Sequence, residues 1–292
     1  MPPVVPTLPI SALTLAAFER DHRATNMPLL VHGVDFGELT KLDARGFGAL
    51  LDDRSIDVRA YSKGFLDNPD AWIEKGYCPK LARMRGWEYA TMIESGMARA
   101  EDLYAVCDVR GSRAGAIFEK VLAEISQRTG LKSTPHLPGV SIWWGPPGHR
   151  EPLHMDITDG TLFQIHGEKT VTLFPDHAWK YLYPFELGSA MSWSFSKVHL
   201  PNPDFERYPL LENALRERID VTLRPGDMLF IPTTWAHEVT GSSEGDHVLS
   251  MNHFWHTPMT KLVHIQEAAL QKLVPEPTRS ELVAKRQAMK AP

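Results

Sequence analysis

The stretch that decides the fold is Ile142-Trp-Trp-Gly-Pro-Pro-Gly-His-Arg-Glu-Pro-Leu-His154-Met-Asp156. It ends in a His-X-Asp pair on a segment that reads as a β-strand. Residues two apart on a strand point to the same face. The side chains of His154 and Asp156 therefore project together, while those of Leu153 and Met155 project to the other face. For an isolated pair the plainer interpretation is a surface His and Asp, so the surrounding sequence has to decide between the two.

A third candidate for binding a metal ion lies farther along the chain. Pro225-Gly-Asp227 is a turn signal, Met228 to Ile231 reads as a buried strand, and His237 opens the next strand. Two histidines and one carboxylate on one face form the ligand set that binds Fe(II) in non-haem oxygenases. A lone histidine here would more often be a satisfied core residue, but with the upstream pair we predict that His237 is the third ligand. The competing histidines without matching surroundings are His166, His177, His199, His247 and His253.

Taken in order, these segments resemble the cupin-like Jumonji C family of Fe(II)- and 2-oxoglutarate-dependent oxygenases, and within it the asparaginyl hydroxylases of the hypoxia-inducible-factor type. The resemblance covers roughly residues 10–258. Its motifs are Asn26-Met-Pro28, Asp102-Leu-Tyr104, Trp144-Gly-Pro-Pro-Gly148, His154-X-Asp156, Gly167-Glu-Lys169-X-Val-X-Leu-Phe-Pro175, Asn202-Pro-Asp-Phe-Glu-Arg-Tyr-Pro209, Pro225-Gly-Asp-X-Leu-Phe-Ile-Pro232, Trp235-Ala-His237 and Ser250-Met-Asn252.

The fold expected from this pattern is mainly β with helical additions. Many short strands separated by turns favour a closed barrel or sandwich. The resemblance implies a double-stranded β-helix, a cupin-like jelly roll, as a catalytic core over residues 101–258. Residues 1–100 are expected to form a mostly helical N-terminal buttress packed on the barrel, and residues 259–292 a C-terminal helical segment. Within the core, Arg113 to Gly130 has the apolar stripe and terminal glycine of a helix.

Two residues are candidates for binding 2-oxoglutarate. Lys169 shares one strand face with Val171 and Leu173, and a lysine that points inward needs an anionic partner because burying an unpaired ammonium is costly. The resemblance assigns Lys169 and Tyr104 to the distal carboxylate of 2-oxoglutarate. The plainer alternatives are a lysine whose head stays in water and a tyrosine that only packs.

The remaining candidates are less sharply defined. The resemblance places Asn252 near the cosubstrate, although Asn252 and the adjacent His253 point to opposite faces and only one of them can face the metal. Glu151 stands where close relatives carry Thr or Ser, and Gly160 where they carry Asn. Glu151 is expected either to turn outward or to bind the substrate. Trp193 belongs to an aromatic segment that is equally compatible with a substrate lid and with a packed loop.

Composition excludes several other classes of protein. A net charge of −5 argues against a nucleic-acid-binding protein, which would usually have a basic face. No apolar run approaches the roughly 20 residues that cross a bilayer, and the N-terminus lacks a signal-peptide pattern. With only two cysteines, Cys78 and Cys107, a reduced cytoplasmic protein without disulfides is the simplest expectation.

The expected activity is hydroxylation of an unactivated C–H bond with Fe(II), 2-oxoglutarate and dioxygen. A protein or peptide side chain is the first choice of substrate. A free amino acid or small natural product remains an alternative, as does a catalytically silent cupin-fold binding module. A predicted helix from Thr260 to Leu273 carries an apolar stripe that either packs on the chain itself or forms a homodimer. The stripe consists of Leu262, Ile265, Ala269 and Leu273.

Overall fold

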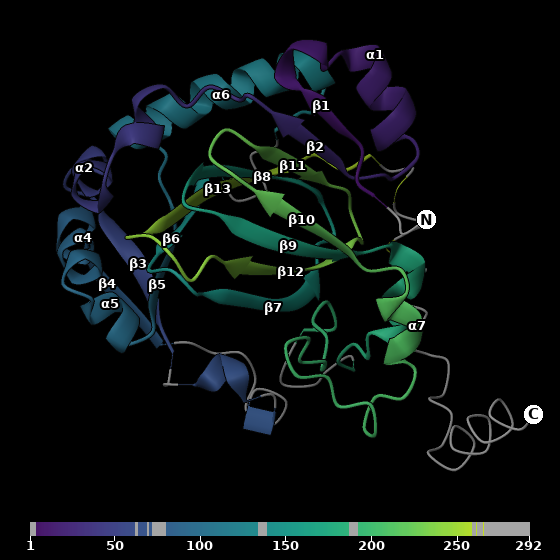
Figure 1. The fold of residues 1–292 in the computed structure, drawn as a ribbon. Coiled ribbons are helices and arrows are strands. Elements are labelled where there is room, and N and C mark those ends of the chain that lie inside the picture. Colours follow the sequence, from purple (N-terminus) through teal and green to yellow (C-terminus); the bar gives the residue numbers. More distant parts are fainter. Residues whose placement is uncertain are drawn as a thin grey trace, which may run out of the picture.

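A computed structural model describes residues 4–61, 64–68, 70–71, 80–133, 139–186, 192–258, 261 and 265. Its core is the expected jelly roll, in which eight successive strands are divided equally between two facing sheets (Figure 1). Consecutive strands lie in opposite sheets except for β9 and β10, which pair with each other in the smaller sheet. These strands are β6 (Ser141–Gly145), β7 (Arg150–Met155), β8 (Asp159–His166), β9 (Lys169–Phe174), β10 (Ile219–Leu223), β11 (Met228–Ile231), β12 (Ala236–Gly241) and β13 (Val248–Trp255).

The two sheets differ in size. The minor sheet has the strand order β10-β9-β12-β7, and the major sheet has the order β1-β2-β11-β8-β13-β6-β5-β3-β4. The tight turn between β8 and β9 contains Gly167, whose φ of 68° is the left-handed conformation that glycine adopts without strain. In the major sheet, β13 lies between β8 and β6. The last strand of the core therefore joins the two halves of this sheet.

The N-terminal region departs from the expected helical buttress, because residues 1–100 contribute four strands that extend the major sheet at both edges. The alternation of buried Ile56 and Val58 with more exposed neighbours has the period of a strand. The strand was missed in the sequence because it is short and lies among segments that were expected to be helical. The additional strands of the major sheet are β1 (Thr7–Pro9), β2 (Leu29–His32), β3 (Ser55–Ala60), β4 (Lys80–Arg85) and β5 (Leu103–Asp108).

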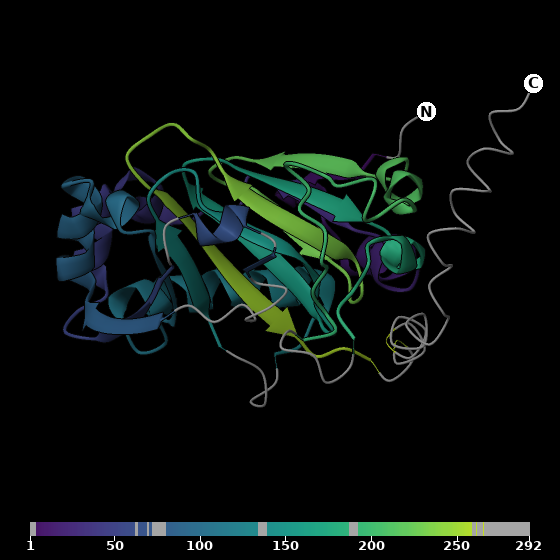
Figure 2. The ribbon, with the colours of Figure 1, turned by 90° about the horizontal axis from the view of Figure 1, so that it is seen from below.

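Helices cover the outer face of the major sheet and one end of the molecule (Figure 2). The predicted helix α6 is present: Ser112 caps its N-terminus and Gly130, with φ of 70°, ends it. Its Phe118 and Ile125 belong to the same apolar cluster as Phe163 of β8. The helical elements are η1 (Ile10–Ala12), α1 (Leu15–Phe18), η2 (Glu19–Arg23), η3 (Gly37–Lys41), α2 (Ala44–Leu50), η4 (Phe65–Asp67), α4 (Gly86–Glu94), α5 (Met97–Ala100), α6 (Arg113–Thr129), η5 (Asp176–Tyr181) and α7 (Leu211–Leu215).

The segment between β9 and β10 covers the outer face of the minor sheet. Leu153 and Met155 of β7 point outward, as their alternation with His154 predicts, and pack with Trp179 of η5 and Leu211 of α7. Between the sheets, one end of the barrel is filled by aliphatic side chains. The other end is left for a cavity.

The predicted C-terminal helix and its proposed homodimer interface lie outside the described residues, except for Lys261 and Ile265. Cys78 is also outside them, while Cys107 is a free thiol. Among the described residues, no helix combines the length and apolar character that crossing a membrane requires.

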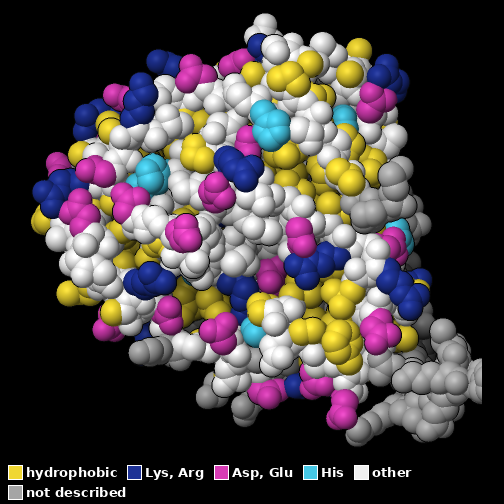
Figure 3. Space-filling model, viewed as in Figure 1, with side chains coloured by type: hydrophobic (Ala, Val, Ile, Leu, Met, Phe, Trp, Pro, Cys, Tyr) yellow, Lys and Arg dark blue, Asp and Glu magenta, His cyan; other side chains and the backbone are white. Residues whose placement is uncertain are grey.

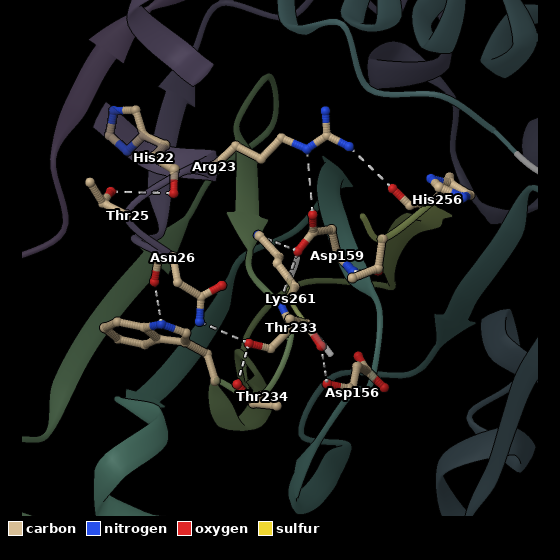
Figure 4. Close-up of polar contacts among 12 residues, drawn as sticks. His22, Arg23, Thr25, Asn26, Asp156, Asp159, Thr233, Thr234, His256 and Lys261 are labelled. Atoms are coloured by element: carbon tan, nitrogen blue, oxygen red, sulfur yellow. Dashed lines mark hydrogen bonds and ion pairs between the residues drawn. The ribbon is translucent and has the colours of Figure 1, made fainter. Parts of the chain in front are cut away.

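A buried carboxylate ties three distant parts of the chain together (Figure 4). Asp159, which begins β8, is fully buried. Its Oδ1 accepts hydrogen bonds from the Lys261 ammonium at 2.8 Å and from the Thr233 amide at 3.0 Å. The Arg23 guanidinium lies 3.8 Å from Oδ2 and donates to the carbonyl oxygen of His256. One anion therefore holds the N-terminal region, the β11–β12 turn and the start of the C-terminal segment.

We predict that Asp159→Ala lowers the free energy of unfolding by about 3–5 kcal/mol, because it leaves the buried Lys261 ammonium without its anion. Asp159→Asn keeps an acceptor for the Thr233 amide and removes only the charge, so it separates the two effects. Glu244→Ala, at an exposed position, is the matched control. Urea unfolding followed by tryptophan fluorescence measures the change. An Asp159→Ala protein as stable as the wild type would contradict a stabilising role for this network.

Candidate active site

The structure brings His154, Asp156 and His237 together. His154 on β7 lies directly opposite His237 on β12 in the strand register. The ring centroids of the two histidines are 4.3 Å apart, and His237 Nε2 is 3.7 Å from Asp156 Oδ2. One potential ligand atom from each residue lies within 4.8 Å of those of the other two. The spacing predicted from sequence thus produces one compact cluster of two imidazoles and a carboxylate.

Backbone carbonyls fix the orientation of both imidazoles. His154 Nδ1 is 2.7 Å from the carbonyl oxygen of Pro152, and His237 Nδ1 is 3.0 Å from that of Trp235. A carbonyl can only accept, so each Nδ1 must carry a proton, and Nε2 is the nitrogen of each ring that is left to bind an ion. Burial, together with the neighbouring His154, lowers the pKa of His237 to about 4, which keeps its ring neutral at physiological pH.

An aromatic ring also restrains His154. The ring of Phe195 stacks on the imidazole with a centroid distance of 5.3 Å, and the two residues form an isolated β-bridge. The Phe195 segment therefore limits rotation of the first histidine.

The backbone of Asp156 is held by the β11–β12 turn, which contains a strained residue. The Thr234 amide donates to the carbonyl oxygen of Asp156 at 2.8 Å. Thr234 has a φ of 68°, which a β-branched residue rarely adopts. The Asn26 side chain donates to the carbonyl oxygen of Thr233 at 3.1 Å, and the Thr233 amide binds the buried Asp159. Backbone strain of this kind persists only where surrounding contacts over-determine it, and it is common at functional sites (Figure 4).

This donor set suits a divalent transition metal ion. Two imidazole nitrogens and one carboxylate form the ligand set of Fe(II) oxygenase sites and would leave further positions on a bound ion for other ligands. The carbonyl partners of both Nδ1 atoms are the outer contacts that orient metal-binding histidines. His154, Asp156 and His237 therefore fit such an ion by chemistry and by orientation.

Among the described residues, one other cluster of potential ligands exists, formed by His166, Asp246 and His247. The rings of His166 and His247 stack at 4.0 Å with an interplanar angle of 8°. Imidazole lone pairs lie in the ring plane, so parallel stacked rings do not direct two of them at one ion. His247 Nδ1 also accepts from the Trp144 indole at 3.3 Å. This cluster is less suited to a metal than the first.

A cavity of about 240 Å³ adjoins His154, Asp156 and His237 at the open end of the barrel. Both polar and apolar residues line it. The lining residues are Arg59, Tyr104, Trp143, His149, Glu151, His154, Met155, Asp156, Gly160, Thr161, Leu162, Lys169, Ser194, Phe195, Ile231, His237, Val239, Asn252 and Phe254.

Lys169 and Tyr104 both line this cavity, as expected. Lys169 is 4% exposed, and it forms no ion pair within 4.0 Å in the part of the chain that the structure describes. Burial lowers the pKa of Lys169 to about 7, although the charge of Glu151 acts in the opposite direction. Burial and the same carboxylate raise the pKa of Tyr104, so its hydroxyl remains a hydrogen-bond donor.

Asn252 rather than His253 faces the cavity. Asn252 Oδ1 accepts a hydrogen bond from the Trp143 indole at 3.0 Å, which leaves its amide group as a donor. The His253 ring points away and contacts the Ser133 hydroxyl at 2.8 Å. Strand alternation predicted that only one of these two residues can face the metal, and the structure shows that Asn252 is the one that faces the cavity.

Glu151 turns inward because of a β-bulge. His154 pairs with His237 and Glu151 pairs with Val239, so β7 uses one more residue than β12 over this interval. The extra residue lets two positions three apart face the same side. Pro152, which cannot donate to a sheet ladder, lies within the bulge. Glu151 is 6% exposed and lines the cavity, so it does not turn outward.

Gly160 stands where close relatives carry Asn, and the space beside it is bordered by a side chain of the neighbouring strand. Gly160 pairs with Phe254 of β13, and a Cβ added to Gly160 would lie 3.6 Å from the Phe254 ring. The aromatic ring takes the room that a larger residue at position 160 would need. Phe254 thus contributes an apolar wall at this point.

Trp193 does not line the cavity; it packs against the apolar cluster on the outer face of the minor sheet. The segment turns at residues 193–194, so Ser194 and Phe195 reach the cavity instead. Sequence reasoning also missed Arg59 and His149. Arg59 comes from a strand in the region expected to be helical, and His149 had no motif of its own.

The surface shows no single basic face in the view of Figure 3, where acidic and basic side chains are interspersed. This distribution agrees with the net negative charge of the chain.

Comparison with known proteins shows which proteins this chain resembles in sequence. The chain is 34% identical over 148 residues to HSPB1-associated protein 1 of Homo sapiens, covering 50% of this chain and 28% of that protein. It is 29% identical over 171 residues to lysine-specific demethylase JMJ31 of Arabidopsis thaliana, covering 58% and 30%. It is 34% identical over 122 residues to tRNA wybutosine-synthesizing protein 5 of Homo sapiens, covering 41% and 32%.

These alignments span about a third or less of each curated relative. The cupin-like domain family, in contrast, matches residues 15–261, which include the whole jelly roll and the three clustered ligands. With its eight-stranded core, its ligand set and this match, the chain belongs to the cupin-like family of Jumonji C-type domains.

Proposed function

We propose that this protein is an Fe(II)- and 2-oxoglutarate-dependent dioxygenase that hydroxylates an unactivated C–H bond, most favourably on a protein or peptide side chain. The observation that carries the proposal is the buried ammonium of Lys169 beside the three clustered ligands. An unpaired buried cation is costly unless a ligand completes it. A carboxylate bound in the cavity supplies the missing anion.

The residues of the cavity divide the work of binding between them. His154, Asp156 and His237 would hold Fe(II), while Lys169 and Tyr104 would hold the distal carboxylate of 2-oxoglutarate. Bound Fe(II) would supply the redox chemistry by which dioxygen oxidises 2-oxoglutarate to succinate and carbon dioxide and a C–H bond to an alcohol. The chain itself positions these groups and excludes water with the apolar walls formed by Phe195, Ile231 and Phe254.

The size of the cavity favours a substrate that inserts only a side chain. A volume of about 240 Å³ is below the roughly 300–1,000 Å³ typical of sites that enclose a small molecule. After a five-carbon dicarboxylate has bound, little space remains for an entire second molecule. The name of the Arabidopsis relative also refers to a lysine-specific demethylase. Both points support a peptidyl substrate over a free amino acid or natural product.

The enzymatic proposal is tested by succinate release with Fe(II), ascorbate and 2-oxoglutarate, and by screening peptides and small molecules for products heavier by one oxygen atom. His237→Ala should abolish turnover and weaken metal binding by more than about 100-fold, since even outer contacts of a metal site contribute 10- to 100-fold. His166→Ala, in the second cluster, is the matched control. A wild-type protein that binds metal but never forms succinate would instead be a silent binding module.

Removing the Lys169 charge should weaken 2-oxoglutarate binding without affecting metal binding. We expect Lys169→Ala to raise the dissociation constant roughly 10- to 150-fold, which corresponds to about 1.5–3 kcal/mol for a charge-assisted contact. Isothermal titration of the Mn(II)-loaded protein measures it, with the exposed Lys120→Ala as control. Equal affinities in the Lys169→Ala and wild-type proteins would exclude Lys169 as the anchor.

The pKa of Lys169 also predicts a pH dependence. Because its pKa is about 7 before the ligand binds, raising the pH through this value removes the proton that the carboxylate needs. The affinity for 2-oxoglutarate should therefore fall between about pH 6 and about pH 8.5, and binding at neutral pH should take up protons. Titrations in buffers of different ionisation enthalpy measure this uptake. Affinity that rises with pH over this range would contradict the assignment.

A further inference from the structure

A carboxylate lies inside the cavity that is proposed to bind an anion. Glu151 is buried, faces inward at the β-bulge and lines the cavity with Lys169 and Tyr104. Its charge is close enough to affect the pKa values of both Lys169 and Tyr104. Left uncompensated, Glu151 would repel the distal carboxylate of 2-oxoglutarate and would compete with it for Lys169.

Arg59 lies against this carboxylate. Arg59 Nη1 is 3.4 Å from Glu151 Oε1, and its guanidinium is 5.3 Å from the centroid of the Trp143 ring. Trp143 in turn donates to Asn252. On the other side of Glu151, His149 Nε2 lies 3.6 Å from Oε2. Although burial opposes ionisation, the His149 ring and the Arg59 charge lower the pKa of Glu151 to about 2, so it is an anion at neutral pH.

Counting charges shows what Arg59 does for the cavity. Apart from three histidines, the acidic and basic side chains that line it are Arg59, Glu151, Asp156 and Lys169. With Lys169 protonated, their charges cancel, and a divalent metal ion brings the total to two positive charges. This total matches one dicarboxylate dianion. Without Arg59, the same sum would be one positive charge, and Glu151 would lose the guanidinium beside it.

We propose that Arg59 is a specificity-determining residue: by pairing with Glu151, it keeps Lys169 available for the distal carboxylate of a dicarboxylate cosubstrate. This inference rests on the proposed function and extends it to residues outside the Jumonji C motifs. The pairing also explains why an acidic residue can stand at position 151 in an anion site. Arg59 reaches the cavity from β3, where it lies opposite Tyr104.

The test compares Arg59→Met, Glu151→Gln and the double variant with the wild type. Isothermal titration of each Mn(II)-loaded protein uses 2-oxoglutarate and 2-oxobutyrate, which has the same 2-oxo acid group but no distal carboxylate. Arg59→Met should weaken 2-oxoglutarate binding at least about tenfold, because the buried Glu151 carboxylate loses the guanidinium charge that offsets its repulsion of the ligand. The double variant should recover to within about threefold of the wild type, since it removes both charges. Affinity for 2-oxobutyrate should stay nearly constant in all four proteins.

Each result distinguishes this inference from the proposed function. If Arg59→Met binds 2-oxoglutarate as tightly as the wild type, Arg59 does not determine specificity. If the double variant stays as weak as Arg59→Met, or if 2-oxobutyrate binding falls in parallel, Arg59 acts through local folding and the inference is overturned. If the wild-type protein binds Mn(II) but not 2-oxoglutarate, the proposed function fails and the inference fails with it.

Discussion

The site depends on one constraint, the register between β7 and β12. His154 lies opposite His237 only in the observed pairing. A slip of one residue would turn the imidazole of one strand to the outer face of the minor sheet, because side chains alternate with a period of two. The apolar residues on the opposite face of β7, Leu153 and Met155, specify this register by packing beneath the β9–β10 segment. The hydrophobic packing of the minor sheet thus sets the geometry of the polar cluster on its inner face.

Two buried charges show how the fold treats structural and functional groups differently. Asp159 is completed within the chain by Lys261, Arg23 and the Thr233 amide, so it contributes to holding the protein together. Lys169 has no such partner among the described residues, and its pKa falls from 10.5 to about 7. Between these values the unfolded chain binds more protons, so the contribution of Lys169 to the free energy of unfolding rises with pH. Below about pH 7, Lys169 is charged in the folded protein too, and burying this charge lowers the free energy of unfolding. A bound anion would offset this loss.

Much of the site could be predicted from the sequence because its residues follow strand periodicity and adjoining turns. The alternation along β7 and β9 placed His154, Asp156 and Lys169 on inner faces, and the Pro225-Gly-Asp227 turn located His237 in the next strand. The inward direction of Glu151 could not be predicted, because a bulge changes the alternation without a signal beyond Pro152. Arg59 was missed since β3 lies far from the motifs, and only pairing with β5 brings it to the cavity. Trp193 misled because aromatic residues in a turn do not reveal which of them face inward.

The central position of β13 in the major sheet has a consequence for how the molecule is assembled during synthesis. All three candidate ligands have been synthesised by residue 237, but β8 and β6 become joined only when residues 248–255 insert between them. Lys261, which binds Asp159 next to the β11–β12 turn, is synthesised later still. A growing chain therefore carries the ligands before the scaffold that orders them. Contacts of such long sequence separation form slowly. Binding of the proposed metal ion is then expected to be one of the last events in maturation, after most of the chain has been synthesised.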